Sequence, residues 1–347
     1  MLARGHAESS VAEAAIESGG VRLTGAAGFA IEIYADGTLR RWDCGPVSLL
    51  LFPGSAMEGG LANLYLRRRA DTLECTPLLG PRGHSVFRAD AAHGTASGRG
   101  TWNGIEYVVT LRLARAAPAW FWHVRLRNTG ASDQHLDLLY AQDVALAPYG
   151  TVRMNEYYVS QYIDHTPLRD AERGVLVASR QNQAVDGRYP WCLLGSLRVA
   201  AAFATDALQF YGLAGRAGGA PPGLAGELPG QRLQHEHSMV ALRDTTLQLA
   251  AGRSAAAGFF GVYVADHPAA SSEADLALAR RALQLSEAAA PELAPNVAPD
   301  VAAEAAEAAA AASDPAGLAA AATGAAACGT GSGPDGAARA VPRPVAP

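Results

Sequence analysis

Alternating apolar and polar side chains between residues 105 and 127 constrain the fold of this chain more than any other feature. Apolar residues recur at every second position from Ile105 to Leu113 and again from Trp120 to Leu126. A period of two residues is typical of a β-strand with one buried face. The short connector 114–118 allows the two strands to fold back on each other, so the sequence predicts an antiparallel hairpin.

The same strand character extends from Val21 to about Tyr263. A second hairpin is predicted around Asp36 and Gly37, because this dipeptide accepts the positive φ angles of a tight turn. So many strands, with no helical pattern between them, predict an all-β fold in the form of a large antiparallel sandwich. The further strand candidates are residues 47–52, 61–67, 86–89, 136–147, 207–213, 240–249 and 258–264.

The composition changes after Tyr263. Ser271 and Ser272, followed by acidic residues, predict the start of a helix that ends near Glu287. Residues 264–347 contain no Phe, Trp or Tyr, and an Ala-, Gly- and Pro-rich chain buries too little apolar surface to offset its entropy. We therefore divide the sequence into a flexible N-terminal segment 1–20, a β-domain 21–268, a linker helix 269–290 and a disordered, low-complexity tail 291–347.

Charge and cysteine usage exclude several classes of function. A net charge of -5 and a pI near 6.0 provide no general basic field, so we expect no nucleic-acid partner. The N-terminus lacks an apolar run long enough for a signal peptide or a membrane span, which predicts a cytoplasmic protein without a membrane contact. No metal-ligand spacing or disulfide framework connects the cysteines, so free thiols are expected at Cys44, Cys75, Cys192 and Cys328.

Residues 155–165 combine three tyrosines with several hydrogen-bonding side chains. Aromatic faces cover the apolar face of a pyranose, while amide, carboxylate and imidazole groups bind its hydroxyls. A half-buried strand with one polar face is the alternative interpretation. For His165 we favour a structural role, either in a pair with Asp164 or as the cap of a turn before Pro167. The predicted sugar-binding residues are Asn155, Glu156, Tyr158, Gln161, Tyr162, Asp164 and His165.

The run Asn-Glu-x-Tyr-x-Ser-Gln-Tyr-Ile-Asp-His at 155–165, with the strands that lead into it at 120–128 and 136–147, resembles the amino-terminal region of glycoside hydrolase family 94. Within that family it is most similar to the 1,2-beta-oligoglucan phosphorylases, relatives of cellobiose phosphorylase. The resemblance covers roughly residues 21–285. It implies a β-supersandwich of the galactose mutarotase type, which in the family is followed by a helical linker and a catalytic barrel of paired helices.

The reaction that this resemblance implies is inverting phosphorolysis of a β-glucosidic bond. An Asp of the barrel protonates the leaving oxygen while inorganic phosphate, a co-substrate of the complete enzyme only, attacks the anomeric carbon. Residues 291–347 offer no counterpart of that barrel. We therefore expect a non-catalytic carbohydrate-binding and scaffolding domain that uses no cofactor and no metal, encoded by a truncated or frame-shifted gene or as a stand-alone module. Expected partners are a β-glucan oligosaccharide and either the missing barrel or a second copy of the chain.

Two other functions stay open. A free-standing aldose epimerase or small glycosidase on the same sandwich would use His235 and His237, or Glu156 and Asp164, as acid and base. A lectin-like domain would bind a glucan without turning it over.

Three further motifs have structural interpretations. His235 and His237 would lie on one face of a strand, but a zinc site there, with His123 or Glu74, lacks a third ligand at a defined spacing. Residues 67–69, all Arg, alternate in direction along a strand and predict a solvated strand end. Tyr189, Pro190 and Trp191 predict a loop anchored on the core.

Overall fold

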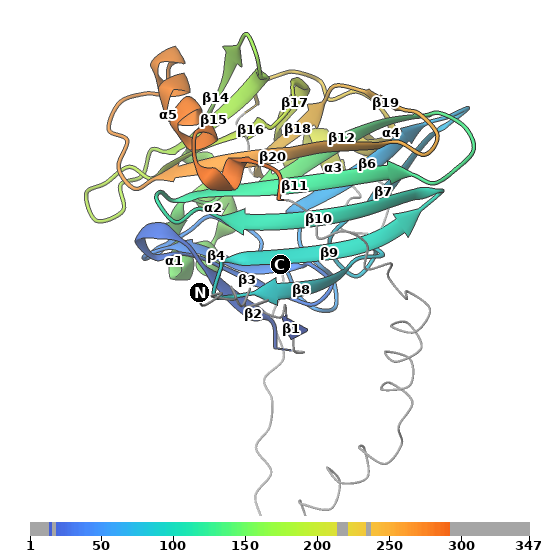
Figure 1. The fold of residues 1–347 in the computed structure, drawn as a ribbon. Helices are drawn as coiled ribbons and strands as arrows, with labels where there is room; N and C mark the ends of the chain where they lie inside the picture. Colours follow the sequence, from blue (N-terminus) through green and yellow to red (C-terminus); the bar gives the residue numbers. More distant parts are fainter. Residues whose placement is uncertain (1–13, 16–18, 214–220, 234–236, 292–347) are drawn as a thin grey trace, which may run out of the picture. The chain divides into compact units, whose positions relative to one another are not determined.

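The computed structural model describes residues 14–15, 19–213, 221–233 and 237–291, and two sheets, antiparallel in all but one strand pair, dominate this part of the chain (Figure 1). β14 (Ile163–Asp170) pairs with β15 (Gly174–Gln181), and β19 (Leu247–Leu249) pairs with β12 (Gln134–Asp143). Within the described residues the larger sheet has 15 strands, and its main path runs through β1 (Ala14–Ala15), β8 (Val86–Asp90), β9 (Thr95–Trp102), β10 (Ile105–Leu113), β11 (Ala119–Asn128), β20 (Ser254–Val264), β16 (Trp191–Ser196), β15 (Gly174–Gln181), β17 (Ala200–Asp206), β18 (Ser238–Asp244), β12 (Gln134–Asp143), β6 (Asn63–Arg69) and β7 (Leu73–Pro77).

The smaller sheet packs on the larger one through a shared apolar core. Side chains of both sheets belong to one buried cluster, in which the Trp42 and Trp120 rings meet edge to face at 4.8 Å and Phe29 stacks on Trp120 at 5.5 Å. Two packed sheets with such a core confirm the predicted all-β sandwich. In hydrogen-bonded order the strands of the smaller sheet are β13 (Ala147–Pro148), β5 (Val47–Ser48), β4 (Leu39–Cys44), β3 (Phe29–Ile33) and β2 (Val21–Thr24).

Both predicted hairpins are confirmed. β10 and β11 pair in the expected antiparallel register, with Ile105 opposite Asn128 and Leu113 opposite Trp120. The turn between β3 and β4 places Gly37 at a φ of 83°, which a residue with a side chain adopts only with strain.

The sequence did not predict strand β9. Its residues Gly98 and Gly100 weaken a strand pattern and favour the interpretation of a loop. The glycines are needed because aromatic rings of the neighbouring strands cross over them. A Cβ atom at Gly98 would lie 2.5 Å from the Phe87 ring, and one at Gly100 would collide with the Tyr107 hydroxyl.

Helical elements interrupt the strand series in three places of the described chain, at residues 26–28, 149–161 and 207–225, so the prediction of strands alone up to Tyr263 was wrong. Predicted strand 207–213 is in fact helix α3 (Ala207–Tyr211), because Asp206 and Gln209 form a capping box that favours a helix start. Other short helical elements are η1 (Ala26–Gly28), α1 (Tyr149–Met154), α2 (Glu156–Gln161), α4 (Pro222–Ala225), η3 (Glu273–Asp275), α5 (Leu276–Leu283) and η4 (Ser286–Ala288).

Helix α5 lies within the segment predicted as a linker. Ser272 and Asp275 form a capping box ahead of it, as its sequence suggested. Leu276 and Ala279 pack in a second apolar cluster with Phe121 and Trp191 of the larger sheet. The helix therefore adds a layer to the sandwich. The predicted tail from residue 292 onwards lies outside the described residues.

The prediction of a solvated strand end at residues 67–69 was wrong. Arg67 is fully buried, and its Nε donates to Oδ1 of the equally buried Asp137 at 2.6 Å. Arg69 contacts the other oxygen of Asp137 at 3.0 Å, and Glu227 bridges Arg69 and Arg243 at 2.8 and 2.6 Å. Arg67 also donates to the Gly226 carbonyl at 2.7 Å. This ionic network fastens the segment around α4 to strands β6, β12 and β18.

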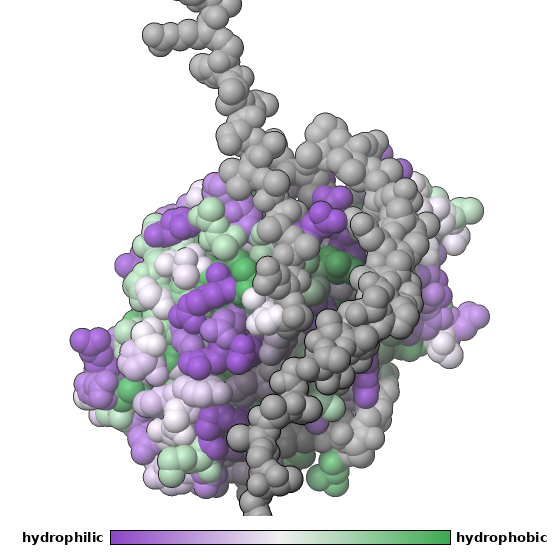
Figure 2. Space-filling model, turned by 90° about the horizontal axis from the view of Figure 1, so that it is seen from below, coloured by the Kyte–Doolittle hydropathy of each residue, from purple (hydrophilic) through white to green (hydrophobic). Residues whose placement is uncertain are grey.

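The other structural predictions can be checked over the described part of the chain. Trp191 is buried and stacks on His267 at 5.0 Å, so this motif does anchor a loop on the core. Cys44, Cys75 and Cys192 are free thiols, whereas Cys328 lies outside the described residues. No helix in the described ranges has the length and apolarity to cross a membrane. On the visible part of the face in Figure 2, hydrophilic and hydrophobic residues are interspersed.

Candidate functional site

The segment that was predicted to bind sugar is a helix–turn–strand unit. Residues 155–165 were expected to be a strand, but they form α2 and the start of β14. Asn155 is the reason, because its extended backbone ends α1 and its Oδ1 accepts a hydrogen bond from the Tyr158 N–H at 3.0 Å. A side-chain oxygen that accepts a hydrogen bond from the backbone N–H three residues later in the chain is typical of a helix N-cap.

Helical rather than strand spacing decides which side chains of this unit face outwards. Val159 and Ser160 are buried, while Tyr157 and Tyr158 expose 39% and 42% of their surface. Gln161 is exposed on the same helix. Residues three and four positions apart share one helical face, so Tyr157, Tyr158 and Gln161 lie on the same side of α2.

Tyr158 and Tyr162 form an aromatic pair at the end of α2. Their ring centroids are 5.0 Å apart at an angle of 60°, and the Tyr162 hydroxyl donates to the Tyr158 hydroxyl at 3.2 Å. This hydrogen bond raises the pKa of Tyr162. Two linked phenols offer both ring surface and hydroxyl groups that can donate and accept hydrogen bonds.

A second aromatic group lies beside the same helix. The Tyr157 ring is 4.8 Å from the His237 ring, which stacks on Phe52 at 5.4 Å. His237 precedes strand β18 and is not part of it, and His235 lies outside the described residues. Within the described ranges no group of three or more His, Cys, Asp or Glu side chains could hold a metal ion.

Asp164 and His165 separate at the start of β14. Asp164 forms an ion pair with Arg232, whereas His165 is buried and bonded to the hydroxyls of Ser179 and Ser238 at 2.9 and 3.1 Å. Burial lowers the pKa of His165 to about 3, so its ring is neutral. Two predictions for His165 are therefore corrected: it cannot reach a surface ligand, and it does not pair with Asp164.

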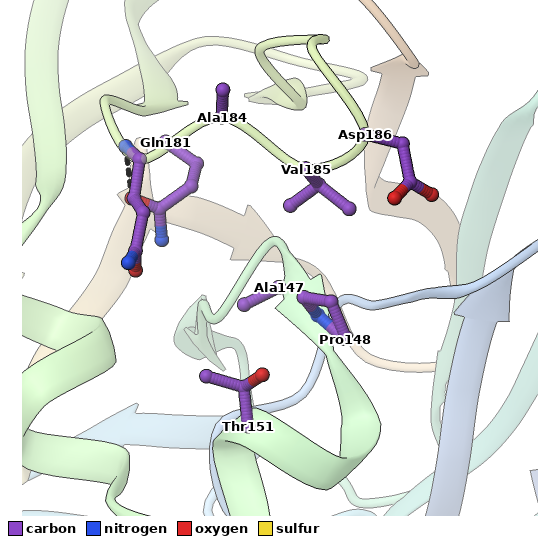
Figure 3. Close-up of a pocket in the computed structure, with 8 residues that line it drawn as sticks. Ala147, Pro148, Thr151, Gln181, Ala184, Val185 and Asp186 are labelled. Atoms are coloured by element: carbon purple, nitrogen blue, oxygen red, sulfur yellow. Dashed lines mark hydrogen bonds between the residues drawn. The ribbon is translucent and has the colours of Figure 1, made fainter.

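A pocket of about 210 Å³ opens beside the helix–turn–strand unit, and no sequence pattern predicted it. Figure 3 shows one wall from β13 and α1 facing the loop that follows β15. The Asn182 N–H donates to the Tyr162 carbonyl at 2.8 Å, so this loop is joined directly to the tyrosine pair. The dipeptide Asp186-Gly187 favours a tight turn, and it is the local sequence feature from which this loop could have been predicted. The lining residues are Ala147, Pro148, Thr151, Gln181, Gln183, Ala184, Val185 and Asp186.

The sequence was then compared with known families and proteins. Residues 32–261 match the family described as SOGP N-terminal domain. The chain belongs to this family. A 1,2-beta-oligoglucan phosphorylase of Listeria innocua serovar 6a is 32% identical over 157 residues, which are 45% of this chain. The match thus spans 13% of the length of that relative of the SOGP N-terminal domain chain. The predicted resemblance to the amino-terminal region of the oligoglucan phosphorylases is confirmed.

Solved structures with a similar fold include two carbohydrate-related proteins. A bacterial glucoamylase complexed with acarbose is 7% identical at a TM-score of 0.41, covering 78% of this chain and 36% of that one. A galactose mutarotase related enzyme of Lactobacillus acidophilus is 8% identical at a TM-score of 0.37, covering 73% of this chain and 100% of that one. The family assignment rests on the sequence matches, and the range they cover includes both α2 and the pocket.

Proposed function

We propose that the chain is a carbohydrate-binding and scaffolding module of a β-glucan phosphorylase and is not catalytic by itself. The exposed face of α2 carries this proposal. Tyr157 and Tyr158 present ring surface beside the amide of Gln161, and a ring flanked by hydrogen-bonding groups suits the two kinds of surface of a glucose unit.

Four buried ionisable groups of the β-domain are engaged within the fold, and this supports a role without chemistry. Asp137 and Asp244 are buried and paired with arginines, and Oδ2 of Asp143 accepts from the N–H groups of Leu51 and Phe52 at 2.7 and 2.6 Å. Burial also lowers the pKa of His123. Each of these groups serves the fold, whereas general acid–base catalysis needs a group within reach of the substrate.

Scaffolding is the second half of the proposal. Met154, the last residue of α1, exposes 88% of its surface, and Tyr157 and Tyr158 of the next helix are also exposed. Large exposed apolar and aromatic side chains in neighbouring helices support an interaction surface. The helical portion of a longer phosphorylase, or a second copy of the chain, would cover Met154 while the tyrosines contact the glucan.

The experiment is a titration of the full chain with a β-1,2-linked gluco-oligosaccharide, followed by tyrosine fluorescence and by calorimetry. Tyr158→Ala should weaken binding several-fold, because an aromatic contact contributes about 0.5–1.5 kcal/mol beyond its area. Leu208→Ala removes an equally exposed apolar side chain from the short helix α3 and should leave the affinity unchanged. Equal affinities of Tyr158→Ala and the wild type for the oligosaccharide would show that the glucan does not bind to the α2 face.

A second assay addresses catalysis. The purified chain, given oligoglucan and inorganic phosphate, should release no glucose 1-phosphate, and it should not accelerate the mutarotation of glucose in a polarimeter. Release of glucose 1-phosphate would show a phosphorylase, and faster mutarotation would show an epimerase.

A further inference from the structure

The pocket beside α2 has walls that are fixed by unusual backbone geometry. Leu146, which is buried and precedes β13, has a φ of 52°, a conformation that is uncommon for a residue with a bulky side chain. The opposite wall ends in a tight turn, with Asp186 and Gly187 at φ angles of 49° and 75°. Val185 and Arg188 close this turn with hydrogen bonds of 2.8 and 3.0 Å in both directions.

Gln181 holds the two walls together. It is fully buried, and its Nε2 donates to the Ala145 carbonyl at 3.2 Å and to the Val159 carbonyl at 3.5 Å. Its Oε1 accepts from the Gln183 N–H at 2.9 Å. The amide thus joins the approach to β13, helix α2 and the loop after β15. A pocket fixed in this way loses little entropy when a ligand binds.

The polar side chains of the lining that remain available can form hydrogen bonds, and none of them carries a positive charge. The Thr151 hydroxyl, the Gln183 amide and the Asp186 carboxylate make no side-chain hydrogen bond or ion pair with any residue in the described ranges. Figure 3 shows Thr151 and Asp186 on opposite sides of the pocket. Together they donate and accept hydrogen bonds, and none of the eight lining residues is cationic. A ligand rich in hydroxyls fits these groups, whereas a phosphate would meet a carboxylate without a compensating charge.

The volume of the pocket limits the size of the ligand that it can hold. About 210 Å³ is below the roughly 300–1,000 Å³ of sites for drug-sized ligands, so the ligand is smaller than these. Ala147, Pro148, Ala184 and Val185 supply apolar contacts for the C–H groups of a sugar ring. The space suits one hexose unit.

We propose that this pocket is a hexose subsite, in which Asp186, Gln183 and Thr151 bind the hydroxyls of a single neutral glucose unit. The proposal deepens the carbohydrate-binding function proposed above and rests on it. The hydrogen bond from Asn182 to the Tyr162 carbonyl places the subsite next to the aromatic face, so one glucan chain would use both. Gln181 is a positioning residue, since all its contacts are within the protein.

The test is saturation-transfer-difference NMR on the full chain, with methyl β-D-glucopyranoside as the probe and inorganic phosphate as the competitor. We expect a saturable glucoside signal that equimolar phosphate does not reduce. Asp186→Asn should weaken binding about tenfold, because it replaces a charged hydrogen-bond acceptor with a neutral one. Asp71→Asn, at another exposed turn, is the matched control and should leave the affinity unchanged. Val185→Trp enlarges a side chain that Figure 3 shows directed towards the opposite wall of the pocket. It removes no polar group and should abolish the signal.

Each remaining outcome contradicts the subsite. No glucoside signal, an undiminished signal in Val185→Trp, or displacement by phosphate would overturn it. Titration of each variant with the oligosaccharide separates the two proposals. Oligosaccharide binding that depends on Tyr158, without glucoside binding, refutes the subsite alone, whereas absence of both refutes the carbohydrate-binding function as well.

Discussion

Replacing Asp137 by Asn tests the buried ionic network that fastens α4 to the sheet. Both Asp137 and Arg67 have fully buried side chains, 2.6 Å apart at their closest atoms. Asp137→Asn preserves the shape of the side chain but leaves Arg67 without its counter-charge, and an arginine cannot escape by losing its proton. Arg69 and Arg243 keep Glu227 as a partner, so the unpaired charge is that of Arg67. Breaking a buried pair in this way costs about 3–5 kcal/mol.

The assay is urea unfolding monitored by tryptophan fluorescence, since Trp42, Trp120, Trp122 and Trp191 are all buried. The double variant Arg67→Met with Asp137→Leu should recover most of the lost free energy of unfolding, because well-packed apolar residues replace a buried pair at little cost. Glu106→Gln is the control. Its pair with Arg127, 3.5 Å apart and about half exposed, is worth less than about 1 kcal/mol. A loss below about 1 kcal/mol for Asp137→Asn, or no recovery in the double variant, would refute the reasoning.

Three further changes test other parts of the fold. Gly98→Ala should lower the free energy of unfolding by about 1–3 kcal/mol, because the new methyl overlaps the Phe87 ring. Gly45→Ala, where φ is 58° and the added Cβ meets nothing within 4 Å, measures in the same urea assay the cost of backbone strain without overlap, whereas Gly98 has no positive φ. Burial raises the pKa of Asp244 to about 7. Between about pH 4 and pH 7 the carboxyl is therefore protonated in the folded protein but ionised in the unfolded chain. This difference lowers the free energy of unfolding as the pH rises from about 4 to 7. Asp244→Asn should remove that slope from unfolding curves recorded between these pH values, and an unchanged slope would contradict the raised pKa. The effect of His165 on the pH dependence of stability has the opposite sign, because its pKa of about 3 lies below that of a histidine in the unfolded chain. Its contribution to the free energy of unfolding is therefore lost as the pH falls from about 6.5 to 3. His165→Gln should flatten that part of the stability curve, and a curve parallel to the wild type would count against a neutral buried ring.

The sequence was sufficient for the sandwich wherever a residue pattern maps onto a single strand. Apolar alternation from Ile105 to Leu113 predicted a strand whose inner residues are all buried in the shared core. It failed at β9, where Gly98 and Gly100 make room for rings of the neighbouring strands. The reason for a glycine was in that case a side chain on another strand, which a local pattern cannot reveal.

Arg67 illustrates the same limit for charge. Three successive arginines indicate solvent when only the strand is considered, because a strand directs adjacent side chains to opposite faces. The burial of Arg67 depends on Asp137 in β12 and on carbonyls around α4, which are distant in sequence. Its partners, and therefore its environment, became visible only with the tertiary structure.

The segment 155–165 shows how one local signal changes a proposed site. Its tyrosines and valine favour a strand, but Asn155 caps a helix, and the helix brings Tyr157, Tyr158 and Gln161 onto one exposed face while it buries Val159. The Val159 carbonyl then accepts from Gln181, which shapes the pocket. A strand at this position would have left neither the aromatic face nor the fixed wall beside it. The binding surface that we propose therefore depends on the cap, and Asn155→Ala should weaken glucoside and oligosaccharide binding together, while Asn155→Asp, which retains a capping oxygen, should preserve both in the same NMR and calorimetric titrations.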